Sequence, residues 1–245
     1  MESFESDASV DCTKLQVIFA SYRDWAQNVG LHVFCHPHVK KMLWAQSQEE
    51  LIELMAQHAH EIDLVLLCGW SWPPEEWMVN SGVPIVSEHP AASDRYSPGT
   101  PLQNQILDGL TTTKHRIVKV GFPELSSRLY SHEVDMSLEG NMDEILDRMR
   151  TTSIQLFDAF LREYPRVSWK QWPAVMPELQ ASRRADSSLS DITAELSHDG
   201  IKGLLSFTTQ ALYDKIRCLG APYPNAYVED ETGRLYFEKV RFEPR

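Results

Sequence analysis

The most apolar run in the chain, residues 62–68, constrains the fold more than any other feature. A short run with a single charged side chain, Asp63, is typical of a strand buried on both faces of a parallel sheet. Residues 15–20 and 84–86 form similar apolar runs, and each is followed by a loop and a helical pattern. Repeated strand–loop–helix units predict an α/β fold with a Rossmann-like, doubly wound and mostly parallel sheet.

The rest of the sequence predicts the helices and the other strands of this fold. A helix at 47–58 begins at Ser47, and Glu50 stands three residues later, which is the capping-box pattern. The longest helix is expected at 141–164, where apolar residues recur at helical spacing until Pro165 ends them. The sequence further predicts strands at 31–35, 114–120 and 129–134 and helices at 101–109 and 208–219.

These elements divide the chain into four parts. Residues 1–12 are expected to be a flexible tail, and residues 13–165 to form the α/β domain. Residues 166–200 are polar and rich in Ser, which favours a linker on the surface. Residues 201–245 are expected to form a small unit with a helix and a hairpin that turns at 229–233. That exposed hairpin suggests a homodimer contact.

The acidic composition argues against a nucleic-acid partner. The 245 residues carry a formal net charge of −12, whereas proteins that bind polyanions use clustered Lys and Arg. The first residues lack the apolar stretch of a signal peptide, and no apolar run has the length of a membrane helix. The four cysteines lie far apart, which favours free thiols. We therefore expect a cytoplasmic protein with neither nucleic-acid nor membrane partners.

The stretch 87–109 is the candidate active-site segment. His89 follows the apolar run 84–86, and a turn-rich loop with Pro90, Gly99 and Pro101 comes before the helix at 101–109. A histidine at the exit of a buried strand, covered by a long loop, is typical of active sites in open α/β sheets. The dinucleotide signature GxGxxG is missing after the first strand, which argues against an ordinary dinucleotide-binding fold.

Residues 87–109 resemble the signature of the formyltransferase superfamily, whose members use 10-formyltetrahydrofolate. Those members include methionyl-tRNA formyltransferases and sugar N-formyltransferases. The signature has the form Asn-x-His-Pro-Ser-Leu-Leu-Pro-x-Tyr-Arg-Gly, followed by a proline and a helix. Matches in the same order at 22–26, 69–72, 137–140 and 216–226 extend the resemblance over about residues 15–240.

The resemblance implies a catalytic core of Asn, His and Asp, which this chain matches only in part. His89 is present, but Ser87 stands at the Asn position. The Asp position falls on Leu125 or Ser126, depending on one residue of offset, and Glu124 is the neighbouring carboxylate that would substitute. The resemblance makes His89, Ser87 and Ser126 the candidate catalytic residues.

The resemblance also implies transfer of a formyl group to an amine of a small molecule, without a metal. A sugar nucleotide or an amino-acid-derived acceptor is favoured over tRNA by the acidic charge and by the length of the chain. Candidate cofactor-binding residues are Trp70, Trp72 and Gly99, with Trp70 and Trp72 expected to flank the pterin ring or else to pack in the core. Tyr22 and Arg23 are candidates for substrate binding, and a surface ion pair is the alternative for Arg23.

Other functions remain open from the sequence. Loss of the Asn and the Asp also fits a different acyl or one-carbon chemistry, or a binding protein without turnover. The run Cys35–His38 and the pair His58 and His60 contain metal-ligand residue types. Their spacing suits neither a helical pair nor the usual zinc frameworks, so histidines at the surface or at strand ends are the favoured interpretation.

Overall fold

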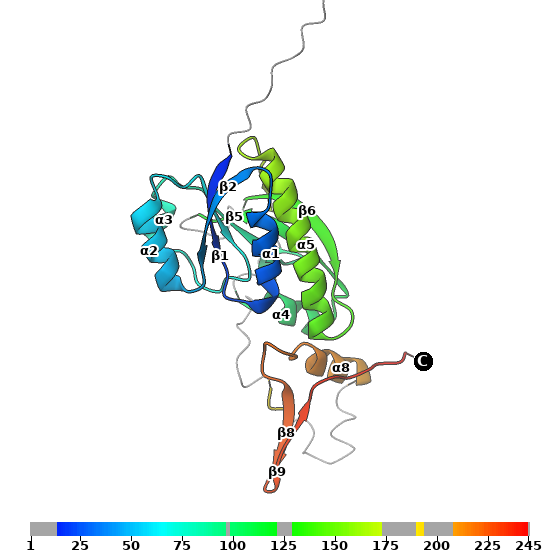
Figure 1. Cartoon of the computed structure of the whole chain (residues 1–245). Helices are drawn as coiled ribbons and strands as arrows, with labels where there is room; N and C mark the ends of the chain where they lie inside the picture. Colours follow the sequence, from blue (N-terminus) through cyan, green and yellow to red (C-terminus); the bar gives the residue numbers. More distant parts are fainter. Residues whose placement is uncertain (1–13, 97–98, 122–128, 173–189, 194–207, 245) are drawn as a thin grey trace, which may run out of the picture.

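The computed structural model describes residues 14–96, 99–121, 129–172, 190–193 and 208–244. A seven-stranded sheet forms its centre, in the order β2-β1-β3-β4-β5-β6-β7 (Figure 1). The four parallel strands are β1 (Leu15–Ala20), β2 (Val39–Ala45), β3 (Leu64–Leu67) and β4 (Ile85–Pro90). The antiparallel strands are β5 (Thr112–Lys119), β6 (Leu129–Ser137) and β7 (Lys170–Gln171).

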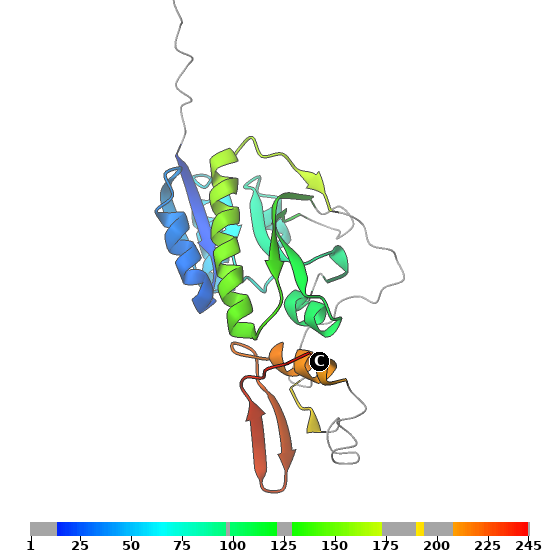
Figure 2. The same ribbon diagram turned by 90° about the vertical axis from the view of Figure 1, so that its right-hand side faces the viewer.

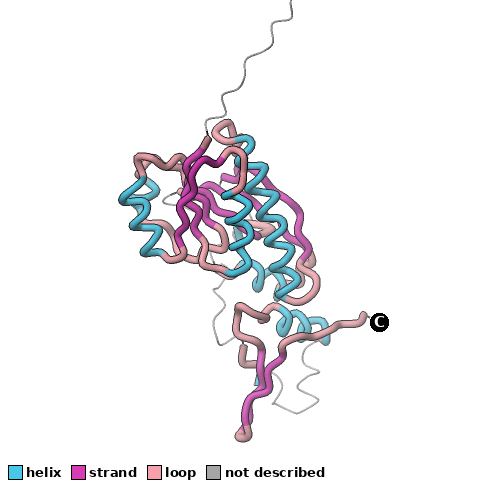
Figure 3. Tube along the Cα trace, viewed as in Figure 1, coloured by secondary structure: helices cyan, strands magenta, loops and turns pink. Residues whose placement is uncertain are grey.

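Helices cover both faces of this sheet, as Figure 3 shows in cyan around the magenta strands. Helices α1 (Asp24–Phe34) and α5 (Met142–Glu163) pack side by side on one face. Helices α2 (Gln48–His58) and α3 (Glu76–Val79) lie on the other. The α/β fold with a doubly wound sheet predicted from the sequence is confirmed, but the sheet is mixed, because three of its strand pairings are parallel and three are antiparallel.

The core has a layer on each side of the sheet. Alternate residues of the buried strands face the two layers, because side chains in a strand point to opposite faces. Leu64 and Leu66 belong to the layer beneath α1 and α5, and Val65 and Leu67 to the layer beneath α2. Every residue of β3 is buried, as expected for the central strand of a parallel sheet.

The strand predicted at 31–35 is wrong, because these residues lie in or just after α1. Ala26, Val29 and Val33 are buried at helical spacing, whereas Leu31 and Phe34 are 55% and 58% exposed. The apolar character of the run therefore comes from side chains on both sides of an amphipathic helix. The second strand is β2, which begins at Val39.

Of the two hydrogen bonds that a capping box at Ser47 predicts, the one accepted by the serine side chain is present. Ser47 Oγ accepts a hydrogen bond of 3.1 Å from the Glu50 backbone N–H. The Glu50 carboxylate accepts from the N–H of Gln46 at 2.7 Å rather than from that of Ser47. Both contacts satisfy backbone donors at the start of α2, which fixes where the helix begins.

The C-terminal residues form α8 (Thr209–Arg217) and the hairpin of β8 (Ala226–Asp230) and β9 (Gly233–Phe237). Figure 2 shows the hairpin extending away from the main sheet. Between the two parts lies α4 (Pro101–Leu107), which follows a 3-10 turn, η1 (Asp94–Tyr96). A shared apolar cluster joins α4, the start of α5 and this unit; its buried members include Leu102, Ile106, Met142, Ile145, Ile216 and Leu219.

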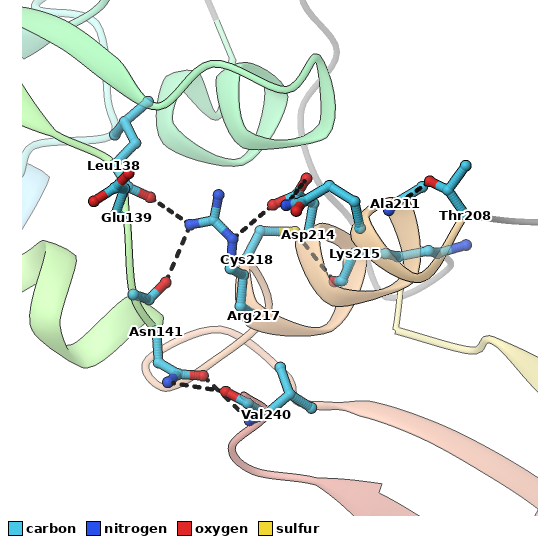
Figure 4. A network of polar contacts seen from close by, with 12 residues as sticks. Leu138, Glu139, Asn141, Thr208, Ala211, Asp214, Lys215, Arg217, Cys218 and Val240 are labelled. Atoms are coloured by element: carbon cyan, nitrogen blue, oxygen red, sulfur yellow. Dashed lines mark hydrogen bonds and ion pairs between the residues drawn. The ribbon is translucent and has the colours of Figure 1, made fainter. Parts of the chain in front are cut away.

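A polar contact accompanies that cluster, centred on the buried Arg217 (Figure 4). Its Nε donates to Asp214 Oδ1 at 2.7 Å. Its Nη1 donates to the carbonyl oxygens of Leu138 and, at 3.1 Å, Gly140. The guanidinium thus satisfies two main-chain acceptors at the turn between β6 and α5. Among the described residues, no helix is both long and apolar enough to cross a membrane.

Candidate active site

A cavity of about 870 Å³ lies at the carboxyl ends of β1, β3 and β4. In open α/β sheets the loops that leave the carboxyl ends of the strands build the ligand site. The cavity gathers seven of the predicted site residues: Tyr22, Arg23, Trp70, Trp72, Ser87, His89 and Gly99. Ser126, with Leu125 and Glu124, lies outside the described residues. A second cavity, of about 550 Å³, runs along the C-terminal hairpin and contains none of these side chains.

Strand β4 positions the two candidate catalytic residues on one face. Ser87 and His89 are two residues apart and both half-buried, so their side chains point to the same side of the sheet. The His89 ring packs edge-on against Trp172, with ring centroids 5.5 Å apart. The Ser87 hydroxyl donates to the Glu88 carbonyl oxygen at 3.1 Å. His89 is therefore oriented by an aromatic neighbour, and the Ser87 hydroxyl is turned toward its own backbone.

An aromatic cluster forms one wall of the cavity. The rings of Tyr22 and Trp72 are 4.6 Å apart between centroids, and those of Trp70 and Trp72 are 5.1 Å apart. Tyr22 Oη also shares a hydrogen bond of 2.6 Å with Ser71 Oγ. Trp70 packs against the core beneath α2, whereas Trp72 is 37% exposed. Trp70 thus contacts the core and also lines the cavity, whereas Trp72 is partly exposed there, and contact of either ring with a pterin stays a prediction.

Arg23 lies at the exit of β1 beside that wall. Its guanidinium carbon is 4.5 Å from the centroid of the Tyr22 ring and 5.8 Å from that of Tyr223. Within the described part of the chain, Arg23 forms no ion pair with a carboxylate. The arginine lies against two aromatic rings, and its role in binding an anionic substrate stays a prediction.

A buried pair of Glu88 and His115 was missed by reasoning from the sequence. The two side chains are 2% and 0% exposed, and Glu88 Oε2 hydrogen-bonds His115 Nε2. Thr152 Oγ1 on α5 contacts His115 Nδ1 at 2.7 Å. Glu88 Oε1 accepts from the Gly69 N–H at 2.8 Å. A glutamate inside an apolar strand, between two polar site residues, was the available signal, because a buried carboxylate requires partners.

Gln105 on α4 is a second missed residue. Its amide donates to the carbonyl oxygens of Pro90 and Pro101 at 2.9 and 2.8 Å. Its Oε1 accepts from the Ala92 N–H at 2.7 Å and from the Thr113 hydroxyl at 2.6 Å. One buried side chain therefore ties the loop after His89 to helix α4 and to strand β5. The sequence offers no signal for this contact beyond a polar residue in an apolar helix.

Burial also changes the pKa of two groups near the site. Burial raises the pKa of Tyr96 to about 12, and the hydrogen bond of 2.9 Å to Asp108 acts in the same direction. Burial raises the pKa of the Cys68 thiol well above its usual value, with the Glu88 carboxylate adding to the effect. Both groups stay protonated near neutral pH, so neither acts there as a base or a nucleophile.

The described residues contain no group of three or more His, Cys, Asp or Glu that could hold a metal ion. His36 and His38 belong to no such group, and their rings pack against each other. The His36 ring lies 3.5 Å from an Asp158 oxygen.

A seven-stranded mixed sheet with a small C-terminal hairpin is the fold of the formyltransferases, and solved structures of that class superpose on this chain. Methionyl-tRNA formyltransferase from Clostridium thermocellum matches with a TM-score of 0.72 and 22% identity, over 94% of each chain. A sugar N-formyltransferase from Shewanella matches with a TM-score of 0.61 and 15% identity, over 94% of this chain and 99% of that one.

A third match is HypX from Aquifex aeolicus in complex with tetrahydrofolic acid. The TM-score is 0.61 and the identity 12%, over 88% of this chain and 36% of that chain. No family model matches the sequence, and no curated protein matches it either. The formyltransferase fold expected from the sequence resemblance is confirmed.

Proposed function

We propose that this protein transfers a formyl group from 10-formyltetrahydrofolate to an amine of a small molecule. The observation that carries the proposal is that His89 and Ser87 line the same cavity as the loops that follow β1 and β3. The likeness in fold to formyltransferases supports this class of reaction. The alternative is a protein that binds the same ligands without turnover, and the replacement of the expected Asn by Ser87 favours it.

His89 is the group that moves the proton in this proposal. Attack of the acceptor amine on the formyl carbon forms a C–N bond and leaves an extra proton on the amine nitrogen. When the bond between the formyl carbon and folate N10 breaks, N10 requires a proton. An imidazole can accept the first proton and return the second near neutral pH.

Ser87 is proposed to serve the oxyanion of the tetrahedral intermediate. Its hydroxyl donates to the Glu88 carbonyl in the structure, and rotation about χ1 would direct it into the cavity. Serine is shorter than asparagine, and loss of an oxyanion donor costs about 10²–10³ in rate. We therefore propose an enzyme slower than one with asparagine at this position.

The acceptor is proposed to carry an anionic group that Arg23 binds. A sugar nucleotide or an amino-acid-derived amine meets this requirement, and the net charge of −12 disfavours tRNA. Chain length, in contrast, does not discriminate, because the match to methionyl-tRNA formyltransferase covers 94% of that chain. The donor is proposed to bind along the aromatic wall, where Trp72 offers a face for its pterin ring. The homodimer and the cytoplasmic location expected from the sequence stay predictions.

The test measures product formation by the wild type, by His89→Ala and by a control variant at an exposed histidine. The purified protein is incubated with 10-formyltetrahydrofolate and a panel of amino sugar nucleotides and amino acids, and formylated products are detected by mass spectrometry. His89→Ala should lower the rate at least about 100-fold. His60→Ala is the control, because its side chain is 74% exposed in the turn after α2. Folate binding without any product, and without an effect of His89→Ala on binding, would establish the binding-protein alternative.

A further inference from the structure

A buried arginine of β5, Arg116, lies directly across from His89. The two residues are register partners in the antiparallel pair of β4 and β5, and residues opposite each other carry their side chains on the same face of a sheet. Glu133 on β6 continues this row, because it is the register partner of Arg116 on the other side. Glu133 Oε2 accepts a hydrogen bond of 2.9 Å from Arg116 Nε. The row thus places a guanidinium group, 4% exposed, between the candidate catalytic histidine and a carboxylate.

Two further contacts of Arg116 are with groups next to His89. Its Nη1 donates a hydrogen bond of 2.5 Å to the carbonyl oxygen of Ala91, two residues after His89. Its guanidinium carbon is 5.2 Å from the centroid of the Trp172 ring, which is within the range of a cation–π contact, and the Tyr130 ring lies at the same distance. Trp172 is 5% exposed and packs edge-on against the His89 ring. Arg116 therefore contacts both the backbone just after His89 and the aromatic ring beside it.

We propose that Arg116 is a positioning residue, which fixes the His89 ring by holding Trp172 and the Ala91 carbonyl in place. This inference rests on the proposed function for what the fixed ring does. Neither Arg116 nor Trp172 is among the described residues that line the 870 Å³ cavity. Their effect on the reaction is therefore exerted through His89. Proton transfer by one imidazole depends on its placement, and an error of about 1 Å can cost about 10² in rate.

Steady-state kinetics of three variants test this role in the formyl-transfer assay. Arg116→Lys keeps the charge but loses the planar group, and Trp172→Leu loses the ring, so each should lower kcat about tenfold or more. KM for the folate donor and for the acceptor should stay close to the wild-type values. Trp172→Phe keeps an aromatic ring beside His89 and should retain most of the wild-type kcat. Product formation by Arg116→Lys with an unchanged kcat would overturn the inference and leave the proposed function standing.

Nuclear magnetic resonance of the ligand-free protein supplies a readout that needs no substrate. The ring signals of His89 are identified by their absence in His89→Ala, and they respond to the nearby Trp172 ring. Arg116→Lys should move these signals toward the positions that they take in Trp172→Leu. Arg217→Lys is the matched control, because Arg217 is also buried, donates to main-chain carbonyl groups and lies 5.1 Å from the Tyr213 ring. It should lower the melting temperature without moving the His89 signals, and an equal movement in this control would overturn the inference.

Glu133→Ala is the second variant, for the case that Arg116→Lys does not fold. The Glu133 side chain is 33% exposed and lies one strand further from His89, so its loss should be tolerated while it removes an anchor of Arg116. The His89 signals should move in the same direction by a smaller amount. Unmoved His89 signals would overturn the inference, whether or not the protein forms product. Moved signals in a protein that forms no product would support the placement by Arg116 and overturn the proposed function.

Discussion

Glu88 Oε1 accepts a hydrogen bond of 2.8 Å from the backbone N–H of Gly69, so a carboxylate of β4 holds the loop that carries Trp70 and Trp72. The same carboxylate bonds His115 on β5 through its other oxygen. The residue between Ser87 and His89 thus joins three segments on the face of the sheet opposite these two side chains.

Glu88→Leu should destabilise the fold by about 3–5 kcal/mol, because His115 and the Gly69 N–H would both lose a buried partner. Glu88→Gln keeps an oxygen for one of these donors and should cost less. Urea unfolding measures both values. A second substitution, His115→Leu, should recover part of the loss in Glu88→Leu, and no recovery would contradict the pairing.

Gly69→Ala should damage the cavity wall. Gly69 has a φ of +59°, and an added Cβ would lie 2.8 Å from the Trp25 ring and 3.0 Å from Arg23 Cγ. The backbone conformation alone costs about 1–2 kcal/mol, and displacement of Arg23 should raise KM for an anionic acceptor. Gly82→Ala separates the two effects, since Gly82 has a φ of +88° with nothing within 4 Å of the added Cβ. Equal KM values in the two variants would refute the role of Arg23.

Ser87→Asn should accelerate formyl transfer. The longer amide side chain restores a donor that reaches into the cavity, and one oxyanion donor is worth about 10²–10³ in rate. We expect a rise in kcat with little change in KM for the acceptor. Steady-state kinetics on the wild type and the variant measure both constants. An unchanged or lower kcat would place the oxyanion away from residue 87.

We predict that deprotonation of Tyr96 lowers the stability of the protein in alkaline solution. Its pKa is raised to about 12 in the folded state, above the usual value of about 10 in an unfolded chain. The stabilising contribution of the neutral phenol is therefore complete below pH ~10 and declines as the pH rises toward ~12. Denaturation at a series of pH values should show a smaller alkaline decline for Tyr96→Phe than for the wild type. Identical pH profiles would contradict the assignment.

Thiol labelling should distinguish the cysteines. Cys35 is exposed, whereas Cys68 and Cys218 are buried. Burial raises the pKa of Cys218 to about 12, and that of Cys68 lies well above its usual value. N-ethylmaleimide at neutral pH should modify Cys35 in the native protein and the two buried thiols only after unfolding. Mass spectrometry of the labelled peptides identifies the sites, and rapid native labelling of Cys68 would contradict the described packing.

Much of the fold follows from periodicity in the sequence. Buried strands such as β3 consist of unbroken apolar residues, and α5 has a regular apolar stripe, so both could be predicted. The run 31–35 could not be assigned correctly, because Leu31 and Phe34 are apolar but exposed, which hides the helical pattern. When both sides of a helix are apolar, the sequence pattern does not show which side packs against the rest of the protein.

The candidate site likewise contains residues whose position a local sequence pattern indicates and residues whose contacts it does not. The sequence could predict that Ser87, His89 and Arg23 lie close together, because the first two are near the carboxyl end of β4 and Arg23 follows β1, and these strand ends meet at one edge of the sheet. The roles of Glu88 and Gln105 depend on contacts between segments distant in the sequence. Such partners are set by tertiary packing, which no local pattern specifies.

The contact of Arg217 with the turn at Leu138 and Gly140 joins the C-terminal unit to the part of the sheet domain beside the cavity. The same unit supplies Pro222 and Tyr223 to the cavity wall, and α5 supplies Leu146 and Met149 just beyond that turn. A chain cut before α8 would leave two carbonyl groups without their Arg217 donor and open one side of the pocket. The candidate site is therefore lined by both parts of the chain, and removing the C-terminal unit would change the ligand-binding cavity as well as the fold.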